Sequence, residues 1–210
     1  MNTSKLKQFV LFIGNAAIHI AWLRVLWTYA TEPVFANEDS CNSLVHSQTL
    51  TALAISGIEL LNSLLGLTKS KPHQVLLFSS VRTGVEMLLA PILPCNAPQH
   101  LFTVGCWALD GLFRFGCFGL DALLSLCGYE SLPVIKSVRY TVGPLLFPLG
   151  AGGEMFMVLR AARDGRPGLY FAASLWPVCF YPLMKQLLKQ RSKHFKKLKD
   201  SKLEEAKKLS

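Results

Sequence analysis

Six long apolar stretches, separated by short polar segments, constrain the fold of this chain more than any other feature. They cover residues 8–30, 48–68, 74–93, 101–126, 133–160 and 168–188. Each is long enough for the roughly 20 helical residues that cross about 30 Å of hydrocarbon. Only 17% of the residues are charged, against about 25% in soluble domains. The pattern predicts an all-α polytopic membrane bundle of six transmembrane helices, because six such stretches leave a soluble protein almost no polar surface.

Lysine and arginine indicate how the bundle is oriented, since they gather in cytosolic loops. Two lysines precede the first stretch, two lie in the second connection, and the tail KQLLKQRSKHFKKLKD is strongly basic. With six spans, these three regions lie on one side. The pattern therefore predicts that both termini are cytosolic, although the segment RAARDGRPG places three arginines on the opposite side.

The composition of the chain changes where the basic tail begins. We expect a six-span membrane domain over residues 1–190 and a basic cytosolic tail over residues 191–210. A run of lysines can bind nucleic acid, but next to a membrane span it more often lies against anionic lipid. Membrane lipid, and not nucleic acid, is therefore the partner predicted for the tail.

The six cysteines include no CxxC pair, so no metal site is predicted. Cys41 and Cys95 lie in connections that the predicted topology puts on the side opposite the termini. Disulfides persist on that side of a secretory-pathway membrane, so a bridge between these two cysteines is a hypothesis.

The predicted spans carry more charge than plain anchors need, and a charge at the bilayer centre costs at least about 2.5–3.5 kcal/mol. These residues are Arg24, Glu59, Arg82, Glu86, Asp110, Arg114, Asp121, Lys136, Arg139 and Glu154. Glu86 follows Arg82 by one turn, and Arg114 follows Asp110 by one turn. This spacing predicts ion pairs along each helix, with either a structural or a functional role. Glu154 has no opposite charge within four residues, which favours a functional role.

Several sequence blocks resemble one family. VRYTVGPLLFPLGAGGE is similar to the RY…YPxGxxxE signature of the very-long-chain (3R)-3-hydroxyacyl-CoA dehydratases, also called protein tyrosine phosphatase-like proteins. GNAAIHIAW, GIELLNSLLGLTKS and WPVCFYPLMKQLLKQRSK resemble the family's YN…GW, EIxNSxLGxxRS and proline-broken last span. Arg82 matches the arginine of its SSR, and Trp107 and Arg114 match WSxxExxRYxxY. The order and spacing of these blocks argue against an unrelated scaffold or transporter.

The resemblance implies a six-span enzyme of the endoplasmic reticulum membrane that needs no metal or redox cofactor. It would remove water from 3-hydroxyacyl-CoA to give trans-2-enoyl-CoA in fatty-acid elongation. Its partners would be the acyl-CoA substrate and other elongation enzymes. The family's catalytic pair is a tyrosine and a glutamate seven residues apart, or about 10 Å along a helix. Such a pair can take the proton at C2 and protonate the hydroxyl that leaves C3.

Glu154 matches the glutamate of that pair, but Phe147 stands at the tyrosine position and cannot transfer a proton. Other polar positions of the family are also replaced, at Gly14, Gly111, Phe115 and either Cys117 or Phe118. Two interpretations remain open. One is an active hydro-lyase in which Glu154 makes both proton transfers, or in which water or another side chain replaces the phenol. The other is a catalytically weak or inactive homologue that binds or regulates elongation enzymes.

Four further residues are candidates for binding substrate: Arg82, Arg114, Arg139 and Tyr140. Tyr140 is the nearest remaining phenol in its span, but it precedes Glu154 by fourteen residues, about 21 Å along a regular helix. We therefore expect Tyr140 to line the pocket and not to replace the missing acid. Arg139 is expected to meet either a phosphate of CoA or an internal carboxylate.

Overall fold

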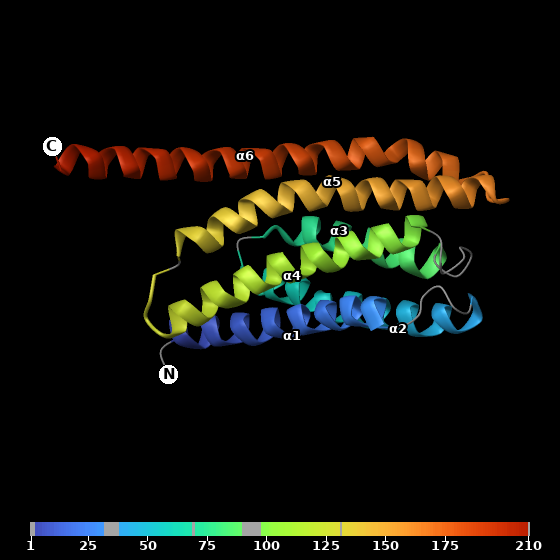
Figure 1. The fold of residues 1–210 in the computed structure, drawn as a ribbon, viewed down its shortest axis with the longest axis horizontal. Coiled ribbons are helices and arrows are strands. Elements are labelled where there is room, and N and C mark those ends of the chain that lie inside the picture. Colours follow the sequence, from blue (N-terminus) through green and yellow to red (C-terminus); the bar gives the residue numbers. More distant parts are fainter. Residues whose placement is uncertain (1–2, 32–37, 69, 90–97, 131, 210) are drawn as a thin grey trace.

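The computed structural model describes residues 3–31, 38–68, 70–89, 98–130 and 132–209. This part of the chain forms six helices: α1 (Thr3–Thr31), α2 (Glu38–Leu64), α3 (Pro72–Leu88), α4 (Pro98–Leu126), α5 (Pro133–Arg163) and α6 (Leu169–Leu209). Consecutive helices run in opposite directions along one long axis, so both ends of the chain lie toward the same end of the bundle (Figure 1). The all-α prediction is confirmed.

Four helices of the described chain are long and apolar enough to cross a membrane: α1, the part of α2 at Leu44–Leu64, α4 and α5. The helix α3 has 17 residues and rises only about 26 Å. The helix α6 has 41 residues, about 61 Å, and its second half is basic. Large apolar side chains such as Trp27, Phe156 and Val178 are exposed on the outside of the bundle, where hydrocarbon would cover them.

Two helices extend beyond the predicted spans. The helix α2 begins at Glu38, inside the segment expected to be a connection, because acidic residues favour a first turn and no proline or glycine interrupts it. The helix α6 passes residue 190 without a break, since its tail is rich in good helix formers. The composition of the chain changes near residue 190, but the helix does not end there. The side chain of Cys41 and all of Cys95 lie outside the described residues, so their bridge stays a prediction.

Two tryptophans centre the core, where α1, α4 and α5 pack together. Trp22 and Trp107 are almost completely buried, and Trp22 donates a hydrogen bond from Nε1 to Ser56 Oγ on α2 at 3.1 Å. The indole of Trp22 lies against Gly111 on α4, so a Cβ at position 111 would overlap the ring. The missing side chain at Gly111 is therefore what lets α1 approach α4 here.

This contact predicts different effects for two Gly→Ala changes on the same helix. Gly111→Ala should lower the free energy of unfolding by about 1–3 kcal/mol, because overpacking forces the Trp22 ring to shift. Gly105→Ala, where a Cβ would meet nothing within 4 Å, should be neutral or stabilise by up to about 1 kcal/mol through helix propensity. Thermal unfolding of the detergent-purified proteins measures both. Equal stabilities of the two variants would contradict the packing argument.

Candidate active site

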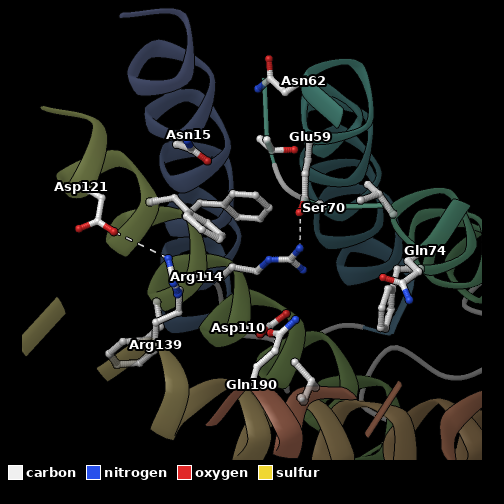
Figure 2. A pocket seen from close by; sticks show the side chains of 18 of the residues that line it. Asn15, Glu59, Asn62, Ser70, Gln74, Asp110, Arg114, Asp121, Arg139 and Gln190 are labelled. Atoms are coloured by element: carbon white, nitrogen blue, oxygen red, sulfur yellow. Dashed lines mark hydrogen bonds and ion pairs between the residues drawn. The ribbon is translucent and has the colours of Figure 1, made fainter. Parts of the chain in front are cut away.

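A cavity of about 880 Å³ lies among the six helices and opens toward the end that holds both termini. Polar side chains line it from several helices, including Asn15 on α1, Asn62 on α2, Gln74 on α3 and Gln190 on α6 (Figure 2). We call this space the polar cavity. Its size is that of a ligand pocket, which commonly measures about 300–1,000 Å³.

The charged side chains of the polar cavity pair between helices. Arg114 on α4 forms an ion pair with Glu59 on α2. Arg82 on α3 donates from Nη2 to Asp110 Oδ2 on α4 at 3.1 Å. The predicted pairs Arg82/Glu86 and Asp110/Arg114 are therefore wrong, and neither forms in the part of the chain described. Spacing along one helix identified charges that need partners, but tertiary packing supplies those partners from neighbouring helices.

Glu86 forms a separate polar cluster toward the other end of the bundle. Its carboxylate is fully buried, with Oε1 lying 2.9 Å from His46 Nδ1 on α2 and Oε2 lying 3.3 Å from His100 Nε2 on α4. The two histidines are 40 and 14 residues from Glu86 in sequence, so no local pattern could reveal them. Within the described residues no group of three or more His, Cys, Asp or Glu is arranged to hold a metal ion. The cluster links three helices.

Glu154 is buried, with 5% of its surface exposed, and the packed helices position it. Trp107 Nε1 on α4 donates to its Oε1 at 2.7 Å, and Arg82 Nε lies 3.9 Å from the same oxygen. The neighbouring Gly153 allows this approach, because a Cβ there would overlap Thr103 on α4. The carboxylate that appears isolated in the sequence thus has a cationic neighbour on α3. Among the described residues its other oxygen, Oε2, accepts no hydrogen bond.

Phe147 lies among aromatic rings. Its ring stacks on Phe180 of α6 with centroids 5.1 Å apart and meets the edge of Phe78 of α3 at 5.2 Å. Phe147, Phe78 and Arg82 line the polar cavity and also a second pocket of about 60 Å³. Glu154 lines only this second pocket. The two pockets therefore adjoin at Phe78, Arg82 and Phe147.

We call the second pocket the apolar slot. Its lining residues lie between Leu77 and Arg82 on α3, between Phe147 and Glu154 on α5, and between Trp176 and Leu183 on α6. Arg82 and Glu154 are its only charged lining residues in the described chain.

Arg139 and Tyr140 lie near the opening of the polar cavity. Arg139 Nη1 is 3.7 Å from Asp121 Oδ2, and its Nη2 donates to Tyr140 Oη at 3.1 Å. Of the two expected partners of Arg139, the structure contains the internal carboxylate. Tyr140 lines the polar cavity, as expected, whereas Glu154 does not. The Tyr140 phenol thus lines the polar cavity, whereas the Glu154 carboxylate lines the second pocket.

The tail contacts this opening through His194 on α6. The ring of His194 packs on Tyr140 with centroids 4.7 Å apart, and its Nε2 lies 3.2 Å from Ser137 Oγ. Burial, followed by the positive charges of Arg139 and Lys136, lowers the pKa of His194 below its ordinary value. The lowered pKa favours the neutral form of the ring.

Comparison with known proteins gives one family. The family model described as protein tyrosine phosphatase-like protein, PTPLA, matches residues 53–197, which include Arg82, Trp107, Phe147 and Glu154. A search of curated proteins and a search of solved structures each gave no match. The matched range includes all of α3, α4 and α5 and parts of α2 and α6, but none of α1.

Proposed function

We propose that this chain, which belongs to the protein tyrosine phosphatase-like family, PTPLA, binds (3R)-3-hydroxyacyl-CoA and dehydrates it slowly. The family is one of endoplasmic reticulum membrane proteins, and membership implies 3-hydroxyacyl-CoA dehydration in fatty-acid elongation. The observation that carries the proposal is Glu154, a buried carboxylate held by Trp107 and faced by Arg82. It lies just beyond a cavity large enough for a cofactor-sized ligand.

Glu154 is the proposed base. Trp107 holds Oε1, which leaves Oε2 to take a proton from C2 of the substrate. The thioester makes this proton acidic, and a positioned base typically contributes about 10²–10⁴-fold in rate. The electron pair of the C2–H bond forms the C2–C3 double bond as the C3–O bond breaks. The departing hydroxide then takes the proton back from Glu154 and leaves as water, so the carboxylate is regenerated.

Arg82 is proposed to stabilise the negative charge that develops on the thioester oxygen. Its Nε is buried and has no hydrogen-bond partner in the described part of the chain. A fixed N–H donor in a site without bulk water is worth more than one in water. Nη2 of the same guanidinium is held by Asp110 at 3.1 Å, which fixes the direction of Nε. Arg82 also lines both the polar cavity and the apolar slot, where the thioester would lie.

The ring cluster around Phe147 favours a second candidate function. A phenylalanine packed between Phe78 and Phe180 offers no proton to the leaving hydroxyl. The chain would then be a weak or inactive homologue that binds or regulates other elongation enzymes. One assay separates the two functions: the purified protein in nanodiscs receives a long-chain 3-hydroxyacyl-CoA, and enoyl-CoA formation and substrate binding are both measured. Product that disappears in Glu154→Ala supports dehydration, whereas binding without product supports the regulatory role.

We also propose that all six helices cross the membrane, with both termini in the cytosol. The helix α3, with 17 residues, is at the lower limit of about 17–25 residues for a span. Lysines lie near the start of α1, precede α3 and are frequent in the second half of α6. On intact microsomes, protease should remove a tag from either terminus. A tag that survives digestion at one end, while detergent exposes it, would contradict this topology.

A further inference from the structure

The apolar slot differs from the polar cavity in the side chains that line it. Leu77, Phe78 and Val81 contribute from α3, and Phe180 and Leu183 contribute from α6. The slot begins at Phe147 and Glu154, where the reacting carbons of the substrate would lie under the proposed mechanism. A hydrocarbon chain that continues from those carbons would meet apolar side chains in the slot and polar amide groups in the polar cavity.

The slot lies among α3, α5 and α6, and a pair of hydrogen bonds joins α3 to α6 at one end of it. Gln74 Nε2 on α3 donates to Gln186 Oε1 on α6 at 2.7 Å, and Gln186 Nε2 donates back to Gln74 Oε1 at 3.3 Å. These are the only hydrogen bonds between α3 and α6 in the described chain. Three residues further from these amides on each helix, the lining residues Leu77 and Leu183 are apolar. Leu77 is 41% exposed, so the slot reaches the surface that lipid would cover.

We infer that the acyl chain of the substrate runs through the apolar slot and enters the bilayer sideways between α3 and α6. The inference rests on the proposed function, because it takes the thioester to lie beside Glu154. The slot encloses about 60 Å³, and one water occupies about 30 Å³ in the liquid. The slot therefore holds only the first part of a long chain. The remainder lies among lipid tails, while the CoA moiety stays in the polar cavity.

Photolabelling tests this path directly. The probe is a long-chain 3-hydroxyacyl-CoA that carries a diazirine within the first few carbons beyond C3, added to the full-length protein in nanodiscs. Mass spectrometry should place the label on Leu77, Phe78 or Val81 of α3 and on Trp176, Phe180 or Leu183 of α6, and unlabelled 3-hydroxyacyl-CoA should compete it away. Leu183→Trp, which fills the slot, should reduce the competed label several-fold. Val178→Trp is the matched control on an exposed position of the same helix and should leave the label unchanged.

The outcomes separate the slot from the function. Label that is competed away but lies on α1, α2 or α4 would overturn the slot and leave the proposed function standing. Equal competed labelling of Leu183→Trp and the unmodified protein would also overturn the slot. If the probe does not bind the unmodified protein, as measured by retention of its CoA moiety, both the slot and the proposed function fail. The label map of the unmodified protein decides the question even if Leu183→Trp does not fold.

Discussion

Phe147→Tyr should raise the rate of 3-hydroxyacyl-CoA dehydration by about 10²–10⁴-fold, the usual contribution of a positioned acid. This corresponds to roughly 2.7–5.4 kcal/mol of barrier. The new hydroxyl would sit on a ring that lines both the polar cavity and the apolar slot. There it can protonate the hydroxyl that leaves C3, while Glu154 takes the proton from C2. Single-turnover formation of enoyl-CoA by the purified variants measures the gain.

Phe78→Tyr is the matched control for this gain. Phe78 contacts Phe147 and lines the same two pockets, but it lies on α3, outside the seven-residue spacing to Glu154. Its added hydroxyl should not raise the rate. The double variant Phe147→Tyr with Glu154→Ala should lose the gain, since the base is then missing. A fast unmodified protein that Phe147→Tyr leaves unchanged would show that another group supplies the acid.

Glu86→Ala should lower the free energy of unfolding by about 3–5 kcal/mol, comparable to breaking a buried pair. The change removes the carboxylate that His46 and His100 share and leaves the buried His100 nitrogen without a partner. Chemical denaturation in detergent measures the loss.

Glu130→Ala is the control for that measurement, because Glu130 is exposed in the connection between α4 and α5. Exposed substitutions usually change stability by less than about 0.5 kcal/mol. If the two variants were equally stable, the Glu86 cluster would have no structural role.

The helices could be predicted from the sequence because each long apolar stretch favours a helix that is covered away from water. The stretch at residues 133–160 corresponds to α5 (Pro133–Arg163), and the stretch at residues 101–126 corresponds to α4 (Pro98–Leu126). The apolar pattern does not predict the helical turns that continue into polar sequence at the start of α2 and in the tail of α6. Hydropathy does not report such helix, which depends on local propensity.

Motif resemblance could predict residues of the candidate site on several helices, but it could not predict the contacts between those helices. Glu154 and Phe147 were found from their spacing and family resemblance. The link from Trp107 to Glu154 and the pairing of Arg82 with Asp110 join different helices. Those contacts depend on how the helices pack, for example on the approach that Gly153 permits. Sequence spacing carries no information about them.

The helix α6 runs without a break from the wall of the apolar slot into the basic tail. Pro177 and Pro182 interrupt the backbone hydrogen bonds of this helix, so its weakest turns lie beside the wall of the apolar slot. From Leu183 to Leu209 there is no proline or glycine, so this segment of about 39 Å continues as one uninterrupted helix. A force applied to the charged end, by a lipid surface or a bound protein, would therefore be transmitted along this helix to the turns at Pro177 and Pro182. The same segment carries Gln186, so a tilt of the tail would strain the hydrogen bonds between Gln186 on α6 and Gln74 on α3.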